Sequence, residues 1–314
     1  MFRLFTRALC ATAAGLLLVA CQQDREPTVA ATAAEDMPSQ SSDPALPASE
    51  TVLAAVLSEQ PEEVIARFKY RHPQETLEFF GIKPGMTVIE ALPGGGWYSK
   101  ILLQYLGSDG RLIGSDYDPE LFPLFGFFSD EDLKAKETWV SDWTEQAQAW
   151  FPDQGVAAVS GMQFGSLPSD LTAQVDAVLL IRALHNLARF EDEGGFLTAA
   201  VADISAALKP GGVVGIVQHM APEDAPDDWA SGSAGYLKKS FVKALFEDAG
   251  FEMVGESSIN ENPKDTPTTD DIVWRLPPTL ASAREDTPEA EAVAAAMTEI
   301  GESTRMTLLF RKPV

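Results

Sequence analysis

The segment that decides the fold runs from Val88 to Ser99 and reads VIEALPGGGWYS. A short apolar run contains the acid Glu90, three consecutive glycines follow, and an aromatic pair then stands where a helix can open. Glycine permits backbone conformations that other residues avoid, and a helix start offers unpaired N–H groups to a ligand. The segment therefore predicts a strand, a tight turn and a helix that together cradle a nucleotide-like ligand.

The residues after this segment repeat the alternation of short apolar runs and longer amphipathic ones. Short apolar runs are typical of strands covered on both faces, and amphipathic runs are typical of helices. Because the two kinds alternate, we predict a doubly wound, mostly parallel α/β sheet. The expected strands are 86–91, 111–116, 156–160, 175–181 and 212–218, and the expected helices are 97–106, 130–150, 189–208 and 238–249.

The chain ahead of the first strand has helical spacing instead. Helices are expected at about 51–58, 61–70 and 74–80, which form a helical N-terminal extension over 51–85. Segments in this position often cover a bound cofactor. Arg71, within the extension, could serve that purpose or simply pair with a surface acid.

The C-terminal part also departs from simple alternation. The segments 251–258 and 305–312 read as strands that can pair antiparallel at one edge of the sheet. Between them lie a stretch rich in Pro, Asp and Thr and an expected helix at 288–300. We interpret 260–303 as a lid or insert before the last strand, within a single domain that spans 51–314.

Acidic residues follow the first two expected strands. In an open α/β sheet the ligand lies beyond the carboxyl ends of the strands, and a carboxylate about 20 residues after a glycine loop holds a ribose. Asp116 ends the second strand 22 positions after Gly94. Asp118 precedes Pro119, so it suits a helix N-cap instead. We assign Asp116 to a ribose, the alternative being a strand-end acid that faces solvent.

The order and spacing of these features resemble class I S-adenosylmethionine-dependent methyltransferases. The segment from Gly85 to Gly96, with Asp116, resembles their first two motifs, and the turn LKPGG at 208–212 resembles the one before their fifth strand. FVKALFEDAGF at 241–251 resembles their late helix. RHPQETLEFFGIKPG, PGGGWYS, RALHN and NPKDTP together are similar to a bacterial group of predicted methyltransferases, over roughly residues 60 to 314.

The resemblance implies a Rossmann-like, seven-stranded sheet with an antiparallel C-terminal strand. It implies S-adenosyl-L-methionine as the cofactor and a small-molecule methyl acceptor, which the sequence does not identify. The cofactor-binding residues that it implies are Glu90, Gly94, Gly95, Gly96 and Asp116.

The loop departs from the methyltransferase pattern at Leu92, which stands where the first glycine is usual. A leucine adopts positive φ only at a cost, and Pro93 favours an extended conformation before it. We therefore predict that the chain turns later, at 94–96. A nicotinamide-binding pattern is also incomplete, because Ser99 replaces its last glycine. The usual adenine-binding acid after the third strand is missing as well, with Gln163 in that region.

A histidine follows the fourth expected strand, in the sequence RALHN. His185 could act as a general base, because the unperturbed pKa of histidine lies near neutrality. Alternatively, His185 and Asn186 only organise the turn and cap the next helix. His219 lies just beyond the fifth strand, at the same predicted edge. No ligand spacing supports a metal site there.

The N-terminus has the features of an export signal. Arg3 and Arg7 are basic, 8–20 is apolar but short for a bilayer span, and LVAC ends at Cys21. This end resembles the lipobox of bacterial lipoproteins, which implies that 1–21 is a signal peptide and that Cys21 is lipidated. Gln22, in place of Asp, implies an outer-membrane anchor that faces the periplasm.

Composition constrains the remaining possibilities. Residues 22–50 have no periodicity and predict a disordered tether. The chain is 45% apolar, with a formal charge of −24 and no concentrated basic segment, which disfavours nucleic acid as a partner. The only cysteines are Cys10 and Cys21, so a mature chain beginning at Cys21 has no disulfide and no cysteine-ligated metal.

The leading hypothesis is therefore an exported, lipid-anchored methyltransferase. An exported protein lies away from the cytosol, where the cofactor is made. A non-catalytic ligand-binding or envelope-interaction module on the same scaffold is accordingly the second hypothesis. A nicotinamide oxidoreductase is the third.

Overall fold

The computed structural model of the protein describes residues 48–152 and 154–314. The expected signal peptide at 1–21, Cys21 and nearly all of the expected tether at 22–50 lie outside the described residues. The first helix, α1, begins at Ala48, three residues before the expected domain boundary.

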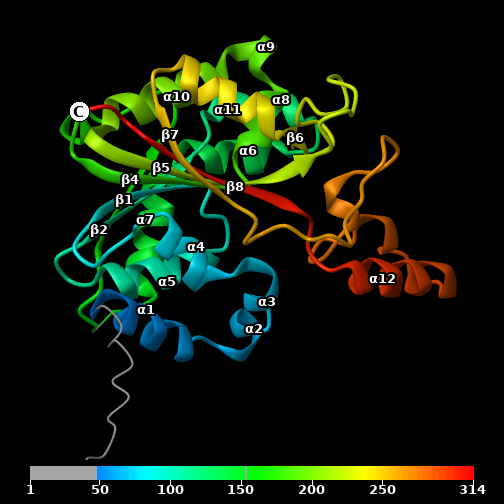
Figure 1. Ribbon diagram of the computed structural model, residues 1–314, viewed down its shortest axis with the longest axis horizontal. Helices are drawn as coiled ribbons and strands as arrows, with labels where there is room; N and C mark the ends of the chain where they lie inside the picture. The colour runs from blue at the N-terminus through cyan, green and yellow to red at the C-terminus, as the bar shows by residue number, and fades with distance from the viewer. Residues whose placement is uncertain (1–47, 153) are drawn as a thin grey trace, which may run out of the picture. The chain divides into compact units, whose positions relative to one another are not determined.

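Seven strands lie side by side in one twisted sheet, in the order β3-β2-β1-β4-β5-β8-β7 (Figure 1). The first five in this order are mutually parallel, and β8 is antiparallel to both of its neighbours. The two-residue β6 pairs in parallel with the C-terminal end of β5. In chain order the strands are β1 (Thr87–Ala91), β2 (Arg111–Asp116), β3 (Ala158–Gln163), β4 (Val175–Ile181), β5 (Leu208–Ala221), β6 (Leu237–Lys238), β7 (Glu252–Ser257) and β8 (Arg305–Arg311).

This strand order confirms the predicted fold class. The sheet is doubly wound and mostly parallel, and its C-terminal strand is inserted antiparallel between β5 and β7. The chain thus has a class I methyltransferase-like fold. The order reverses between β1 and β4, which places the switch point, where ligands bind in such sheets, beyond the ends of these two strands.

Helices cover both faces of the sheet (Figure 1). One face carries α1 (Ala48–Ser58), α4 (Pro73–Phe79), α5 (Trp97–Leu106) and α7 (Trp139–Ala149), with α2 (Glu62–Ile65) and α3 (Phe68–Arg71) beside them. The other carries α6 (Asp130–Glu137), α8 (Leu184–Arg189), α9 (Glu191–Gly194), α10 (Phe196–Ala207) and α11 (Lys239–Asp248). Beyond one end of the sheet lies α12 (Pro288–Ile300), and short 3-10 turns occur at η1 (Pro119–Phe125), η2 (Ser169–Leu171), η3 (Val273–Arg275) and η4 (Ala281–Ala283).

The apolar runs of the strands explain this two-sided cover. Successive side chains of a strand point to opposite faces, so a strand without polar residues must be buried on both. Accordingly, Val88 packs into the cluster on the α5 face and Ile89 into the cluster on the α10 face. Leu179 and Leu180 of β4 divide in the same way. Phe80, which follows α4, lies so close to β5 that a Cβ on Gly215 would stand 2.6 Å from its ring.

Several expected helices are divided in the structure. The expected helix at 130–150 is two helices, because Thr138 leaves the helical path and its hydroxyl donates to Asp142. The expected helix at 189–208 starts at the last residue of α8 and is divided into α9 and α10. Gly195 turns the chain there with φ 66°, and the Glu191 carboxylate accepts from the N–H of Leu197.

The boundaries of two strands and one helix also differ from expectation. The expected strand at 156–160 lies at Ala158–Gln163, and the expected helix at 61–70 is α2 and α3. The turn expected at 208–212 belongs to β5, because Gly211 and Gly212 pair with Lys312 near the end of the chain.

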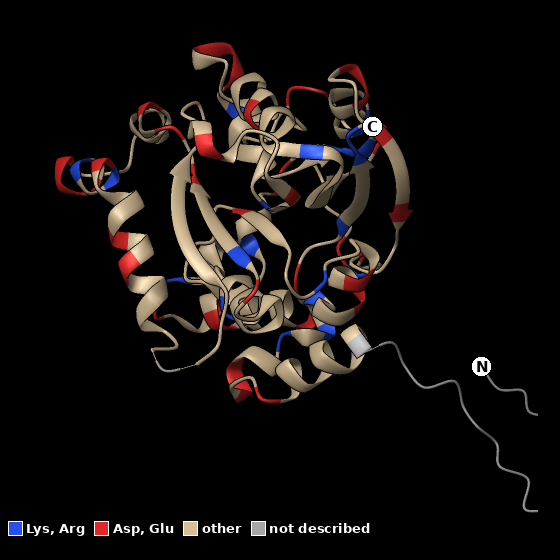
Figure 2. Ribbon diagram, turned by 90° about the vertical axis from the view of Figure 1, so that its left-hand side faces the viewer, with Lys and Arg blue, Asp and Glu red and all other residues tan. Residues whose placement is uncertain are grey.

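The excess of acid is spread over the molecule rather than gathered at one site. Figure 2 shows Asp and Glu on helices and loops all around the sheet, with Lys and Arg interspersed. A solvated acidic surface of this kind favours solubility. No helix within residues 48–152 and 154–314 combines the length and the apolar composition needed to cross a bilayer.

Candidate functional site

The loop after β1 turns at 94–96, as predicted, but it also bends earlier, at Leu92. Leu92 has φ 52°, in the left-handed region that favours glycine, although we expected it to be extended. Its N–H donates to the Ser115 carbonyl at 2.7 Å, which continues the ladder between β1 and β2 by one residue. We attribute the left-handed turn to this tertiary hydrogen bond, which outweighs a local preference of about 1–2 kcal/mol.

Of the three glycines that follow, two have exposed backbone and the third is covered by a side chain. Gly94 has φ 54° and is exposed, as is Gly95, so their backbone is accessible to a ligand. Gly96 has φ 76° and is the N-cap residue of α5. It lies under Trp150, since a Cβ built on Gly96 would stand 2.3 Å from the indole ring. Only glycine fits at position 96, for conformational and steric reasons alike.

Glu90 is a buried acid one residue before the end of β1. Its side chain is 4% exposed and accepts a hydrogen bond from the Ser99 hydroxyl of α5 at 2.6 Å. Burial raises the pKa of Glu90 to about 7, against the opposing effects of Ser99 and of the cationic Arg182. Glu90 therefore changes its charge near neutral pH.

Asp116 lies at the end of β2, as predicted, but it has an internal partner. Its carboxylate is 1% exposed, accepts from the N–H of Tyr117 and is 2.9 Å from the Lys136 ammonium. Burial raises the pKa of Asp116 and Lys136 opposes this. Gln163, at the position where we noted the missing acid, donates to the Lys136 carbonyl and thereby holds α6 over this corner. Asp118 accepts from the N–H of Glu120, which confirms its expected N-cap role.

A second left-handed residue follows β4. Arg182 has φ 61°, and its N–H donates to the Val217 carbonyl at 2.6 Å, so it extends the β4–β5 ladder as Leu92 extends that of β1 and β2. The two corners are joined by Tyr117, whose hydroxyl donates to the Ala183 carbonyl at 2.6 Å. Strained non-glycine residues cluster at functional sites, and here two flank the switch point.

A pocket of about 260 Å³ opens between these two left-handed residues. The pocket is walled on one side by strand ends and on the other by 273–279, so the expected insert over 260–303 contributes one of its walls. Its apolar lining comes from Leu92, Ile181, Val273, Trp274, Leu276, Pro277 and Pro278, and its polar lining from Arg182, His185, Asn186, His219, Thr279, Glu302 and Ser303.

Both histidines of the RALHN and β5 segments line this pocket, and both are neutral. Burial lowers the pKa of His185 to about 4 and that of His219 well below its usual value. The His185 Nδ1 is 3.4 Å from the Gln218 Oε1, and the Gln218 amide nitrogen donates to Gly235. That arrangement assigns the proton of His185 to Nδ1 and leaves Nε2 as an acceptor.

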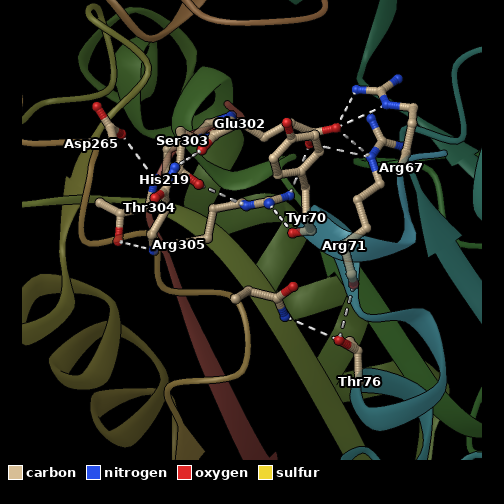
Figure 3. A network of polar contacts seen from close by, with 12 residues as sticks. Arg67, Tyr70, Arg71, Thr76, His219, Asp265, Glu302, Ser303, Thr304 and Arg305 are labelled. Carbon is tan, nitrogen blue, oxygen red and sulfur yellow. Dashed lines mark hydrogen bonds and ion pairs between the residues drawn. The ribbon is translucent and has the colours of Figure 1, made fainter. Parts of the chain in front are cut away.

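Three arginines converge on one buried carboxylate beside the pocket (Figure 3). Glu302, 4% exposed, receives Arg67, Arg71 and Arg305. Arg71 thus pairs with a buried acid and not with the surface acid that we considered. It also lies over the Trp97 ring, with 4.5 Å between its guanidinium carbon and the ring centroid. The three cations lower the pKa of Glu302 even though burial raises it.

The NPKDTP motif has a structural role in this network. Asn262 donates to the carbonyls of Ile300 and Glu302. Asp265 accepts from the N–H of Thr304 and forms a buried ion pair with Arg275 at 2.9 Å. The motif thus holds the chain just ahead of β8.

The structure brings the predicted residues to one edge of the sheet but into two neighbouring environments. Glu90, the glycines and Asp116 lie at the ends of β1 and β2, whereas His185 lies in the pocket between β4, β5 and the insert. Sequence reasoning gave no role to Arg182, Lys136 or Trp150. The position of Arg182 directly after an apolar strand could have indicated it. Within the described part of the chain, no group of three or more His, Cys, Asp or Glu side chains is arranged to hold a metal.

Comparison with known proteins adds similarity of fold. No family model and no curated protein sequence matches the chain. Similar solved structures include the cyclase SpnF, with TM-score 0.47, 17% identity, and coverage of 78% of this chain and 80% of that one. A SAM-dependent methyltransferase from Aquifex aeolicus has TM-score 0.44 and 16% identity, with coverage of 66% of this chain and 93% of that one. The YcgJ protein from Bacillus subtilis has TM-score 0.43 and 16% identity, covering 78% and 99%. Scores below 0.5 leave the activity and ligand of this chain to be argued from its own site.

Because Leu92 has a left-handed backbone, we predict that glycine is better tolerated than alanine at this position, the reverse of the order within a helix. We expect Leu92→Gly to destabilise the protein less than Leu92→Ala, by about 1 kcal/mol, because glycine alone adopts positive φ without cost. At Leu102, inside α5, the order should be the usual one, with glycine about 1 kcal/mol worse than alanine. Denaturant unfolding of the four variants measures both differences. If the alanine variant at position 92 is as stable as the glycine variant, the turn in solution is not left-handed.

The buried Glu90 predicts a pH-dependent gain in stability on neutralisation. Its folded-state pKa lies above the unfolded value of 4.5, so the penalty on folding builds up as pH rises from 4.5 to about 7, is fully present above pH 7 and disappears as pH falls to 4.5. We expect Glu90→Gln to raise the free energy of unfolding by about 3 kcal/mol at pH 8 and by almost nothing at pH 4.5. Urea unfolding followed by circular dichroism across this range measures the difference.

An exposed glutamate provides the control for this measurement. Lys243 lowers the pKa of Glu256, so Glu256→Gln should slightly destabilise the protein at pH 8, with the opposite sign. A Glu90→Gln effect that is independent of pH would show that the pKa of Glu90 is the same in the folded and the unfolded protein.

Proposed function

We propose that the protein is an S-adenosylmethionine-dependent methyltransferase that acts on a small-molecule acceptor. One observation carries the proposal: a buried acid, an accessible glycine turn and a second strand-end acid lie together at the switch point of a sheet with the methyltransferase strand order. In this proposal the cofactor lies across the ends of β1 and β2, and the acceptor occupies the pocket beside β4 and β5.

The residues at this edge match the needs of the cofactor in kind. Exposed backbone at Gly94 and Gly95 allows close approach, and Asp116 is an acceptor for ribose hydroxyls. The bound cofactor would supply an electrophilic methyl group. Such a transfer needs mainly the positioning of two reactants, so the chain need not carry a conspicuous catalytic motif.

His185 has the position and protonation state of a general base in this proposal. Its Nε2 is free to accept a proton from an acceptor hydroxyl in the pocket, while Gln218 orients the ring through Nδ1. The lowered pKa keeps His185 unprotonated at neutral pH, although it also makes the imidazole a weaker base than an ordinary histidine. The apolar wall of Trp274 and Leu276 would exclude water from the reacting atoms.

A specific observation favours the alternative, a non-catalytic ligand-binding or envelope-interaction module. Lys136 lies 2.9 Å from the carboxylate of Asp116 that a ribose would need, and Trp150 covers Gly96. Cofactor binding requires that Lys136 move aside or share this carboxylate. In the non-catalytic alternative, Lys136 is the permanent partner of Asp116.

Direct binding of the demethylated cofactor separates the two. We expect S-adenosylhomocysteine to bind the full-length protein in isothermal titration calorimetry, and Asp116→Asn to weaken binding about 10- to 100-fold by removing a charge-assisted hydrogen bond. The matched control is Asp118→Asn, which alters a nearby helix cap and should change the affinity less than twofold. Absence of binding to the wild-type protein, with no adenosyl compound found in it by mass spectrometry, would refute the methyltransferase proposal and favour the module.

We also propose that the protein is exported and anchored in the outer membrane, facing the periplasm, through a lipid on Cys21. The support is the resemblance of the N-terminal segment to a lipobox, together with Gln22. A single acyl chain binds a membrane only marginally, at about 0.8 kcal/mol per buried CH₂, whereas a multiply acylated cysteine anchors stably. Export would place the protein away from cytosolic cofactor, which adds weight to the non-catalytic alternative.

The anchor predicts incorporation of a fatty-acid probe in cells. The full-length protein should be labelled and should sediment with membranes, whereas Cys21→Ser should be unlabelled and soluble. Cys10→Ser, a change at the other cysteine, should retain both properties. Equal labelling of the wild-type protein and Cys21→Ser would exclude lipidation at this residue.

A further inference from the structure

The charges around the pocket are unequally paired. Glu302 is contacted through one oxygen by Arg67 and Arg71 and through the other by Arg71 and Arg305. Three cations thus share one anion, and Arg305 also donates to the backbone carbonyls of Ser303 and Tyr70. The acid that lines the pocket is therefore more than neutralised before Arg182 is considered.

Arg182 is the cation that this cluster leaves without a partner. Among the described residues, its guanidinium forms no ion pair within 4.0 Å and no side-chain hydrogen bond, and the residue is half-buried in the pocket wall. Its pKa is lowered to about 10, first by burial and then by Arg305, against the longer-range attraction of Glu302, so it is charged at neutral pH. A half-buried, unpaired guanidinium is costly, and an anionic ligand would relieve that cost.

The other titratable groups of this edge do not compensate Arg182. His185 and His219 are neutral, and Glu90, which attracts Arg182 at longer range, is only partly ionised near pH 7. The pocket is therefore locally positive in a protein whose formal charge is −24. A concave site of one sign, with low-dielectric walls, concentrates ligands of the opposite sign.

The other residues that line the pocket indicate what the remainder of such a ligand is like. Leu92, Ile181 and Trp274 offer apolar walls, while the His185 Nε2 and the Asn186 Oδ1 are acceptors. The Asn186 Oδ1 is buried without a hydrogen-bond partner, so it calls for a donor. At about 30 Å³ per water-sized group, a pocket of about 260 Å³ holds on the order of ten non-hydrogen atoms.

We propose that this pocket binds a small, hydroxylated aromatic or apolar carboxylate, with the carboxylate on Arg182 and the hydroxyl donating to His185 or Asn186. That this ligand is the methyl acceptor rests on the proposed function; that the pocket binds a carboxylate does not. The amino-acid portion of S-adenosylmethionine is a second source of a carboxylate, and the experiment distinguishes the two.

The probe is 4-hydroxybenzoate, and its neutral isostere 4-hydroxybenzamide is the control ligand. We expect calorimetry on the full-length protein at pH 7.5 to give at least tenfold tighter binding of the carboxylate than of the amide, and this difference should shrink at high salt. Arg182→Met should reduce carboxylate affinity to the level of the amide and leave amide affinity within twofold. Arg111→Met, which removes the same charge at the opposite end of β2, should leave both affinities unchanged.

The comparison of the two ligands on the wild-type protein requires no variant, so a folding defect in Arg182→Met cannot obscure the result. Equal affinity for carboxylate and amide would overturn the proposal. Competition between S-adenosylhomocysteine and 4-hydroxybenzoate, with both weakened by Arg182→Met, would assign the carboxylate to the cofactor and overturn its assignment to the acceptor.

The two proposals fail separately. Binding of S-adenosylhomocysteine without preference for the carboxylate would refute only the pocket assignment. Carboxylate binding that depends on Arg182, without any binding of S-adenosylhomocysteine, would refute the methyltransferase and retain the anion site.

Discussion

The buried carboxylate of Glu302 is the interaction on which the rest of the candidate site depends. It joins Arg67 and Arg71 of the N-terminal extension to Arg305 of the last strand, across more than 230 positions of sequence. A carboxylate in the interior costs several kcal/mol to desolvate, and here three guanidinium groups offset that cost. Because Glu302 is fixed, the chain just ahead of β8 and its Ser303 are fixed as well. The N-terminal extension is thus a structural part of the edge where ligands are expected.

Burial is the main reason for the low pKa of both histidines. Arg182 lowers the pKa of both further, whereas Arg305 and Arg71 of the Glu302 cluster act on His219. At this edge of the sheet, positive charge and uncharged hydrogen bonding are thus supplied by different residues, although a single histidine can provide both. Arginine supplies permanent positive charge, while imidazole remains an uncharged hydrogen-bonding group at neutral pH.

The sequence was sufficient for the fold class because its strands are short apolar runs with clear ends. The strands at 111–116 and 175–181 and the helices at 97–106 and 288–300 have the predicted bounds. The predicted helix bounds were wrong where one residue diverts the chain, as Gly195 does. The periodicity of apolar residues in the sequence continues through such a break and therefore does not reveal it.

The places of the candidate site residues in the fold were predictable, but their contacts were not. Glu90 and Asp116 lie at the predicted strand ends, yet Lys136 and Trp150 reach the site from distant parts of the chain. Leu92 was misjudged for a related reason. Local preference disfavours its conformation, and a hydrogen bond to the neighbouring strand overrides that preference. Interactions set by tertiary packing leave little trace in one sequence.

The Tyr117 hydroxyl joins the turn after β2 to the turn after β4. Tyr117 follows Asp116 directly, and its phenol donates to the carbonyl of Ala183, the residue after Arg182. Burial raises the pKa of Tyr117, so the phenol remains a donor throughout the physiological pH range. A ligand that displaces Asp116 would therefore pull on the turn that carries Arg182. By linkage, any effect of a ligand at Asp116 on the affinity for an anion at Arg182 would be reciprocal. The Tyr117 hydrogen bond directly connects the two turns at which these ligands, which need not touch, are proposed to bind.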